Sequence, residues 1–294
     1  NTNKLVKSRE IIIDGPVLLL MGPIGTFFAR FYKFLSRNNV CTYKVIFPLY
    51  EFGFPKSCRL EYNDDIENFR DYLLVIINKY NIKHIFMHCD FIIPHKIAIE
   101  LCEDLRKNNN YIRSHVFELG YLRPNFITLE DNGVNINSPL NKGYDFYNSL
   151  PSVTNIPVFY NVRQFRYRKI WKGITFVNHA LTNYKILEKP HKLNPKFKYI
   201  YYAILGNIRK YKYSITEYFI KKDICKNLNF FLVILQVETD SQVIDASPFN
   251  NNKEFISYVM ESFGNNSLNK NRLVFKHHPK DRGYTNYFNY IRKL

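Results

Sequence analysis

The chain has 294 residues, 46% of them hydrophobic, and a formal net charge of +17. This length provides for two domains of ordinary size, each with its own hydrophobic core. Five scattered cysteines without a CxxC pair argue against a disulfide framework or a zinc site and favour a reducing cytoplasm. The polar N-terminus predicts no signal peptide, and no apolar run approaches the roughly 20 residues of a membrane-spanning helix.

The strong positive charge suits a nucleic acid, an anionic lipid surface or a phosphorylated substrate. No Arg/Lys tract, RNP-like aromatic motif or zinc-finger spacing indicates nucleic acid, so we expect no nucleic-acid partner. Part of the charge reflects a composition rich in Ile, Asn, Lys and Tyr. The remaining positive charge favours an anionic membrane or a nucleotide as the binding partner. Val162–Trp171 is basic and aromatic and is a candidate membrane contact, although a charged helix face is the more common outcome.

The first half of the chain predicts short apolar strands that alternate with amphipathic helices. Right-handed βαβ units of this kind build a parallel sheet, and ligands collect at the carboxyl ends of its strands. Gly22–Gly25, Asp90 and Glu118 are expected at three of those ends. The predicted strands are Val17–Met21, Thr42–Pro48, Lys83–Met87, Arg113–Phe117 and Phe126–Leu129, and the predicted helices are Phe27–Ser36, Ile66–Tyr80 and His95–Asn108.

Two of these strand ends carry further signals. The turn that holds Gly22 and Gly25 leads into a helix, which can present backbone N–H groups to an anion. It has neither a GxGxxG pattern nor a Walker lysine, so a plain tight turn is the more common outcome. In Val116–Asn135 a strand delivers Glu118, a glycine and Arg123 follow, and an Asn-Gly turn closes the stretch. These charges are either solvated in a turn between two strands or form a functional strand end.

The last third of the chain repeats the strand, loop, helix and strand order, so a second α/β domain is expected there. The domain boundary is placed near residues 199–207, which gives domains at 1–205 and 206–294. Asn137–Pro157, rich in Asn, Ser, Pro and Gly, is predicted to be a long loop. The elements of the second domain are a strand at Asn229–Leu235, an acidic loop at Gln236–Gln242, a helix at Lys253–Phe263, and a strand at Arg272–Lys276 that ends in His277-His278-Pro279-Lys280.

Five stretches occur in order at the predicted strand ends: GPIGTFF, CDFIIPHKIAIELC, FELGYLRPNFITLEDNGVN, LQVETDSQV and FKHHPKDRG. Together they resemble the capsule polysaccharide biosynthesis family of the KpsS and LipB type, over about Val17 to Gly283. The resemblance implies a GT-B-like α/β fold with two Rossmann-like domains facing a cleft, the first on the acceptor side and the second binding the nucleotide sugar. Family members continue well past the His-Pro motif that His278-Pro279 matches, so the second domain is expected to be truncated at Leu294.

The family implies a glycosyltransferase that moves Kdo (3-deoxy-D-manno-oct-2-ulosonic acid) from CMP-Kdo to a lyso-phosphatidylglycerol acceptor, which begins a β-Kdo linker. It implies no cofactor and no metal. It also implies a cytoplasmic protein that is peripheral on the inner face of the cytoplasmic membrane, with other capsule assembly proteins as partners. Two alternatives stay open: a transferase for another CMP-sugar, such as a sialyltransferase, or a non-catalytic partner in capsule assembly or export.

The resemblance also implies the catalytic residues. Donor and product both carry a β linkage in this family, so configuration is retained and a carboxylate nucleophile is favoured, for which Glu118 is the candidate. Alternatively, Glu118 forms a structural hydrogen bond with Arg123 or with the backbone. Broader relatives read EDGFLRS here, and their second acidic position is Leu119 in this chain. His278 is expected to donate to the donor phosphate and assist departure of the leaving group.

The remaining residues are candidates for binding. Gln236, Asp240 and Ser241 match the family's loop and are expected to bind cytosine, ribose or Kdo hydroxyls, or else to cap a helix start. Asp90 and His95 match the family pattern GDxRPxH only in part, so a helix-capping and packing role is expected for them, and His277 is expected to be structural. The other residues expected to bind substrate or nucleotide are Gly22, Gly25, Arg123, Lys276 and Pro279, with Lys280 adding positive charge.

Overall fold

A computed structural model describes residues 12–23, 25–47, 53–120, 126–150, 196–226, 229–238, 240–268 and 270–294. The chain divides into two compact units, residues 1–189 and residues 190–294, which we call the N-terminal unit and the C-terminal unit. Each unit is described by itself.

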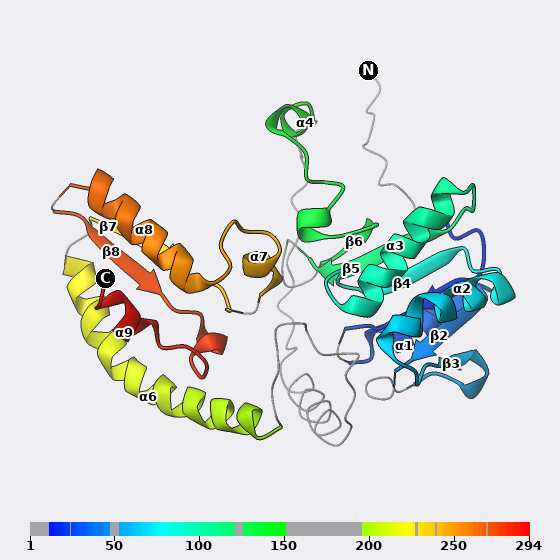
Figure 1. Cartoon of the computed structure of the whole chain (residues 1–294), viewed down its shortest axis with the longest axis horizontal. Helices are drawn as coiled ribbons and strands as arrows, with labels where there is room; N and C mark the ends of the chain where they lie inside the picture. Colours follow the sequence, from blue (N-terminus) through cyan, green and yellow to red (C-terminus); the bar gives the residue numbers. More distant parts are fainter. Residues whose placement is uncertain are drawn as a thin grey trace. The chain divides into compact units, whose positions relative to one another are not determined.

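The N-terminal unit is built on a six-stranded sheet with the strand order β3-β2-β1-β4-β5-β6 (Figure 1). All neighbouring strands are parallel except the edge strand β6, which runs antiparallel to β5. The predicted α/β class and parallel sheet are therefore confirmed. The strands are β1 (Val17–Leu19), β2 (Thr42–Ile46), β3 (Arg59–Glu61), β4 (His84–His88), β5 (Arg113–Leu119) and β6 (Ile127–Asp131).

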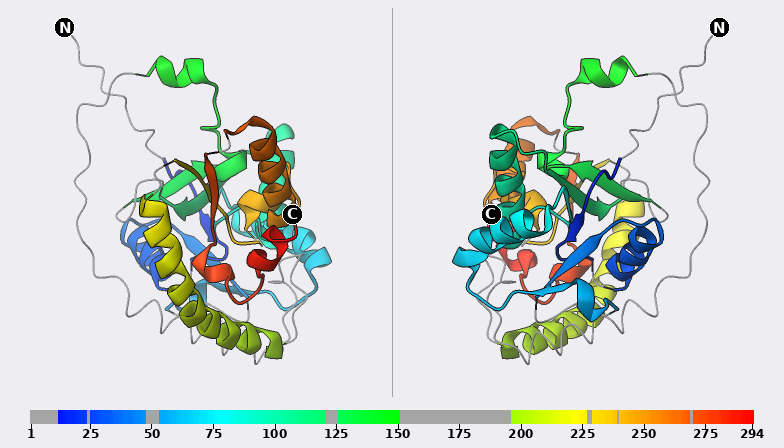
Figure 2. Two further views of the ribbon diagram at one scale, coloured as in Figure 1. Left: turned by 90° about the vertical axis from the view of Figure 1, so that its left-hand side faces the viewer. Right: turned by 90° about the vertical axis from the view of Figure 1, so that its right-hand side faces the viewer.

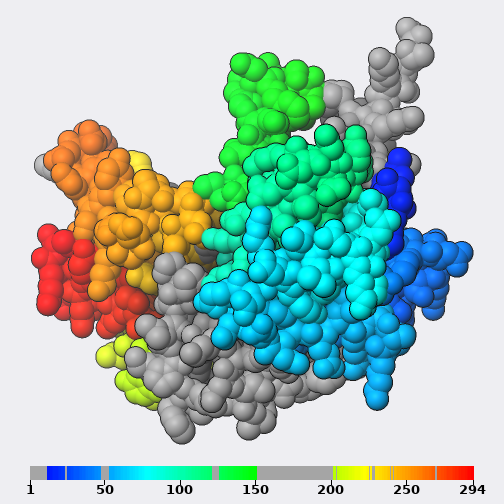
Figure 3. Space-filling view, turned by 45° about the vertical axis from the view of Figure 1, so that its right-hand side comes forward, coloured from blue at the N-terminus to red at the C-terminus, as the bar shows by residue number. Residues whose placement is uncertain are grey.

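Helices cover both faces of this sheet. On one face, α1 (Phe27–Arg37) buries Phe28 and Leu35 in a cluster with residues of β1, β4 and β5. On the other face, α2 (Phe69–Tyr80) and α3 (Ile93–Lys107) bury apolar side chains at helical spacing, and their outer surfaces are seen in Figure 3. Fully burying one such Leu, Ile or Phe side chain contributes roughly 1.5–3 kcal/mol, so these two clusters hold the three layers together.

Several elements of this unit differ from the predictions. The short edge strand β3 was not expected, because its residues are charged or only half-buried and show no apolar alternation. The short helix α4 (Tyr144–Asn148) falls inside the predicted loop and stands apart from the sheet with exposed side chains (Figures 1 and 2). Single 3₁₀ turns complete the connections at Lys56–Cys58, Ile66–Asn68 and Asn135–Asn137.

The C-terminal unit contains two parallel strands, β7 (Phe230–Ile234) and β8 (Arg272–Lys276). The long helix α6 (Lys196–Lys226) and helix α8 (Asn252–Asn266) lie on opposite sides of this pair (Figures 1 and 2). The predicted boundary between residues 205 and 206 falls inside α6. The remaining elements are α7 (Ser241–Ile244), the 3₁₀ turn Pro279–Asp281 and α9 (Tyr287–Ile291).

The core of the C-terminal unit is small. Leu235, Ile256 and Tyr287 are buried at its centre, where β7, α8 and α9 meet. Large apolar side chains of β7 stay exposed: Phe231, Leu232 and Ile234 each keep more than half of their surface accessible. The two-domain GT-B arrangement stays a prediction.

Candidate functional site

The carboxyl edge of the N-terminal sheet brings together three residues that were expected at strand ends, two of them predicted site residues. Leu19 is in register with Phe86 and His88 with Phe117, so β1, β4 and β5 end side by side. Gly22 follows β1, Asp90 follows β4 and Glu118 lies at the end of β5. The strand order changes direction between β1 and β4, and ligands of open α/β sheets bind at such a point.

Glu118 is half-buried, and its Oε1 accepts a hydrogen bond of 2.8 Å from the Leu119 N–H. One of the two structural alternatives, a hydrogen bond to the backbone, is thus present. The second alternative involves Arg123, which lies outside the described residues. Among the described residues, Oε2 has no hydrogen-bond partner. A carboxylate held through one oxygen keeps the other for a ligand, so the backbone contact and a chemical role are compatible.

Glycine is needed at the two positions after β1 for different structural reasons. A Cβ on Gly22 would lie 2.6 Å from Cγ of Phe28, so glycine lets α1 pack closely on the strand end. Gly25 has a φ of +124°, a conformation that other residues rarely adopt. Thr26 precedes α1 and makes no side-chain hydrogen bond to cap it. The first N–H groups of α1 therefore receive no side-chain cap, and anion binding by this turn stays a prediction.

Asp90 joins two parts of the N-terminal unit. Its Oδ2 accepts hydrogen bonds from the Val134 N–H and from Nδ2 of Asn137, each 3.0 Å long. The predicted helix-capping role is wrong for α3, because Ile92 occupies the N-cap position and no side chain caps that helix. The buried carboxylate instead holds the loop after β6 against the end of β4, which is a packing role.

His95 is fully buried at the start of α3. Its Nδ1–H donates to the Cys89 carbonyl over 2.8 Å, and burial lowers the pKa of His95 to about 3, so the ring is neutral at pH 7. Its Nε2 has no hydrogen-bond partner in the parts of the chain that the structure describes. The expected packing role is confirmed, and the ring closes the turn that follows β4.

Lys44 was missed in the sequence. It lies in the middle of β2 with no exposed surface, and its Nζ donates to the Leu20 carbonyl over 2.9 Å and to the Val45 carbonyl over 2.6 Å. Burial lowers the pKa of Lys44 well below its ordinary value. A lysine inside the apolar run TYKVIFP was the available signal. Its amino group ties β2 to the residue that follows β1, at the carboxyl edge.

A chain of four side chains crosses the opposite part of this sheet and was also missed. His84 Nε2 lies 2.8 Å from Asp14 Oδ1, and His84 Nδ1 lies 2.9 Å from His115 Nε2. His115 Nδ1 in turn lies 2.7 Å from Asp131 Oδ1. Both imidazoles are buried, and desolvation lowers the pKa of His84. The chain links the segment before β1 to β4, β5 and β6, and it lies at the beginning of β4 rather than at the carboxyl edge.

The HP turn of the C-terminal unit, His278-Pro279-Lys280-Asp281, follows β8 directly. The Lys280 N–H donates to His278 Nδ1 over 3.2 Å, so the hydrogen of the neutral ring is on Nε2. Burial and then the positive charge of Lys280 lower the pKa of His278, which keeps the ring neutral at pH 7. Its Nε2–H is thus a donor without another partner among the described residues. This geometry suits a hydrogen bond to an anionic oxygen.

The loop after β7 borders a cavity of about 220 Å³. Polar groups of Gln236, Gln242, Ser247 and Asn252 line it together with apolar side chains of β7, α7 and α8. Asp240 Oδ1 accepts from the Gln242 N–H over 3.0 Å and caps the start of α7, as the helix-cap alternative predicts. Amide and hydroxyl groups beside aromatic walls are the lining that a nucleobase or a sugar requires.

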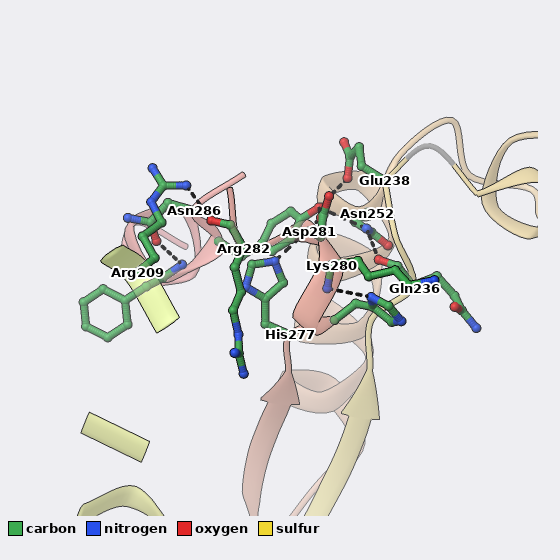
Figure 4. Close-up of polar contacts among 12 residues, drawn as sticks. Arg209, Gln236, Glu238, Asn252, His277, Lys280, Asp281, Arg282 and Asn286 are labelled. Carbon is green, nitrogen blue, oxygen red and sulfur yellow. Dashed lines mark hydrogen bonds and ion pairs between the residues drawn. The ribbon is translucent and has the colours of Figure 1, made fainter. Parts of the chain in front are cut away.

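A polar network surrounds the buried hydroxyl of Tyr287 and includes Glu238, Asn252 and Asp281, which are labelled in Figure 4. Tyr287 Oη lies 2.9 Å from Asp281 Oδ2, hydrogen-bonds Glu238 and accepts from Asn252 Nδ2 over 3.0 Å. The ring of His277 packs edge-on against Tyr287, and its Nε2 lies 3.6 Å from Asp281 Oδ2. Burial, followed by the hydrogen bond to Glu238, raises the pKa of Tyr287. Sequence reasoning missed this network apart from the structural role of His277.

A sequence profile of the family described as "Capsule polysaccharide biosynthesis protein" matches residues 92–294. The Escherichia coli "Capsule polysaccharide export protein KpsS" is 30% identical over 292 residues, which are 94% of this chain and 71% of that protein. This chain belongs to the capsule polysaccharide biosynthesis protein family.

The Neisseria meningitidis "Capsule polysaccharide modification protein LipB" proteins of serogroups A and B are 28% and 29% identical to this capsule family member, over 100% of the chain and 70% of each relative. No solved structure matches it. The family match and these relatives together show a role in capsule polysaccharide biosynthesis, and the roles of the site residues stay predictions.

Within the described ranges, no group of three or more His, Cys, Asp or Glu side chains is arranged to hold a metal ion.

Proposed function

We propose that this capsule family member is a glycosyltransferase that moves Kdo from CMP-Kdo to a lyso-phosphatidylglycerol acceptor with retention of configuration. The observation that carries the proposal is the HP turn. There, His278 presents an Nε2–H donor, and the neighbouring strand ends in a loop beside a cavity lined by amide, hydroxyl and apolar side chains. Membership of the capsule polysaccharide biosynthesis family and the five motifs in their order also support the proposal.

In this proposal the C-terminal unit binds the CMP part of the donor. The Nε2–H of His278 donates to the phosphate and stabilises the negative charge that grows on it as the bond to Kdo breaks. Lys276 and Lys280 add positive charge at the same strand end. Gln236 and its neighbours in the cavity take the cytosine or ribose.

The N-terminal unit supplies the reacting carboxylate. Oε2 of Glu118 attacks the anomeric carbon of Kdo, the bond from that carbon to the phosphate oxygen breaks, and CMP leaves with the electron pair. The acceptor hydroxyl then attacks the same carbon, its proton passes to a base, and Glu118 is released. Two inversions give net retention. The 2.8 Å contact from the Leu119 N–H orients the carboxylate for the first step.

Incubation of the protein with CMP-Kdo and a lyso-phosphatidylglycerol analogue, followed by mass spectrometry of the lipid, tests the proposal. A lipid that has gained one or more Kdo residues is the expected product. Folded protein that gives no Kdo-lipid would overturn the proposal, and turnover of CMP-sialic acid instead would establish the sialyl-type alternative. The non-catalytic alternative, which Leu119 favours, predicts no turnover of either donor.

Two substitutions test the assigned residues. Glu118→Gln is expected to remove nearly all transfer, whereas Glu103→Gln, on an exposed position of α3, should leave it unchanged. His278→Gln is expected to lower the rate by roughly 10²- to 10⁴-fold, as loss of an acid catalyst does. Full activity of the Glu118 variant would refute the nucleophile, even if the transferase activity itself is found.

We also propose that the protein works on an anionic membrane surface, because its acceptor is a lipid and its net charge is +17. In the described part of the chain, no helix is both long and apolar enough to span a bilayer. Electrostatic attachment to anionic vesicles is expected to weaken steeply with salt. Binding that persists at high salt would contradict an electrostatic contact.

A further inference from the structure

One tyrosine hydroxyl connects the two parts of the C-terminal unit that are proposed to hold the donor. Tyr287 comes from α9, yet its Oη meets side chains from three other segments: Glu238 from the loop after β7, Asn252 from the start of α8, and Asp281 from the HP turn. Figure 4 labels these three side chains. The ring is almost completely buried, so water does not replace these contacts. The hydroxyl is therefore a shared anchor for these segments.

The first arm of this anchor fixes the HP turn. Asp281 ends the 3₁₀ turn that begins at Pro279, and its carboxylate is 1% exposed. The Asp281 N–H donates to the His278 carbonyl over 3.0 Å, and the Asp281 carbonyl accepts from the Tyr284 N–H over 3.0 Å. Holding the Asp281 side chain thus sets the backbone of the turn and, through it, the direction of the His278 ring.

The second arm fixes the wall of the cavity. Asn252 Nδ2 donates to Tyr287 Oη over 3.0 Å and to the Gln236 carbonyl over 2.8 Å. Gln236 and Asn252 both line the cavity after β7. Because one amide group touches both Tyr287 and the cavity wall, a shift of the tyrosine hydroxyl is transmitted to Gln236.

We propose that Tyr287 is a positioning residue of the donor site, whose hydroxyl holds His278 and the Gln236 wall at a fixed separation. This inference rests on the proposed function, since the site is the one assigned to CMP. Tyr287 itself touches neither phosphate nor nucleobase. The single proton of the hydroxyl lies between the carboxylates of Asp281 and Glu238. Without it the two carboxylates lie unbridged beside each other, and we expect their like charges to separate the two segments.

Tyr287→Phe removes the hydroxyl and keeps the ring that packs on His277. Tyr290→Phe is a matched control, because Tyr290 Oη also makes an inter-helix hydrogen bond, 2.7 Å to Ser257 Oγ, but does not contact the HP turn. We expect the affinity for CMP to fall about tenfold or more in Tyr287→Phe and to stay within about twofold of wild type in Tyr290→Phe. Equal losses in both variants would overturn the proposal.

A substrate-free readout separates this inference from the proposed function. The charged groups that face His278 are Lys280, Asp281, Asp240 and His277. The pKa of His278, measured by NMR titration, should therefore change in Tyr287→Phe, where Asp281 is expected to move, and not in Tyr290→Phe. If neither variant nor wild type binds CMP, the proposed function fails, and the titration still decides whether Tyr287 sets the turn. An unchanged His278 titration would refute the positioning role.

Asn252→Ala provides a second test, which also applies if Tyr287→Phe does not fold. It removes the arm to Gln236 and leaves the contact between Tyr287 and Asp281 in place. We expect weaker CMP binding together with an unchanged His278 titration, a split that general destabilisation would not produce. Unchanged CMP affinity in this variant would refute the link from Tyr287 to the cavity wall.

Discussion

Substitution of Gly283 by alanine tests how the HP turn is held from its other side. Gly283, two residues after the turn, meets α6 backbone to backbone: a Cβ on Gly283 would overlap the Tyr202 carbonyl oxygen, lie 3.0 Å from the Tyr202 carbonyl carbon and lie 3.4 Å from the Gly206 N. Around this contact, Arg209 Nη1 donates to the Arg282 carbonyl over 2.9 Å. The obstacle is main chain, so no side-chain rotation can relieve the overlap.

The cost follows from the geometry. The backbone at position 283 and α6 must separate by roughly 1 Å to restore an ordinary contact, and overpacking of this kind typically costs about 1–3 kcal/mol. Gly264 in α8 is a matched control, because a Cβ there meets nothing within 4 Å. Alanine inside a helix is more stable than glycine by roughly 0.5–1 kcal/mol, so Gly264→Ala should gain a little.

Thermal and urea unfolding measure both variants. A loss of about 2 kcal/mol corresponds to a Tm lower by roughly 4–8 °C for a chain of this size class. We expect Gly283→Ala to unfold earlier by this margin and Gly264→Ala to unfold no earlier than wild type. If Gly283→Ala is as stable as wild type, α6 and the segment after the HP turn are not in backbone contact, and the reasoning is refuted.

Two buried bases of the N-terminal unit give pH-dependent predictions. Because the pKa of His95 falls to about 3 on folding, the unfolded chain binds more protons below pH 6.5, and stability is lost as the pH falls. Between pH 6.5 and 5 the free energy of unfolding falls by about 2 kcal/mol from this cause. In urea unfolding, the free energy of unfolding of His95→Gln should therefore fall less steeply with decreasing pH than that of wild type, and an identical slope would contradict the prediction. Folding also lowers the pKa of Lys44, so its burial costs stability at neutral pH and that cost shrinks as the pH rises toward 10. Lys44→Met should therefore be at least as stable as wild type at pH 7 and lack the rise in stability at alkaline pH; a large loss at pH 7 would show that the hydrogen bonds to Leu20 and Val45 outweigh the desolvation.

The sequence allowed prediction of the elements whose pattern is local. The apolar spacing of Ile66–Tyr80 and the proline at residue 94 predicted α2 and α3, and the apolar runs predicted β4, β5 and β7, each to within a few residues. The alternation of strands and helices was sufficient to predict the parallel sheet. The carboxyl ends then brought Gly22, Asp90 and Glu118 to one edge without further information.

Features that depend on distant residues were not predictable. The helix α6 is different, because Ile204, Ile208, Tyr211 and Ile215 recur at helical spacing and were an available local signal. Lys44 has the sequence pattern of a strand residue with an exposed charge, but its buried amino group donates to the Leu20 carbonyl, 24 residues away. Two hydrogen-bond partners of Tyr287, Glu238 and Asn252, are 49 and 35 residues away from it in the sequence. Their meeting follows from the parallel pairing of β7 with β8 rather than from any spacing.

The exposed apolar side chains of β7 are expected to affect how this protein behaves in solution. Phe231, Leu232 and Ile234 lie on a strand of a two-stranded sheet, and accessible strands of this kind pair with other copies. A net charge of +17 opposes such association through mutual repulsion between molecules. Added salt screens that repulsion and leaves the apolar attraction intact. Salt that releases the protein from vesicles should therefore also lower its colloidal solubility, so the two effects need separate measurement by light scattering.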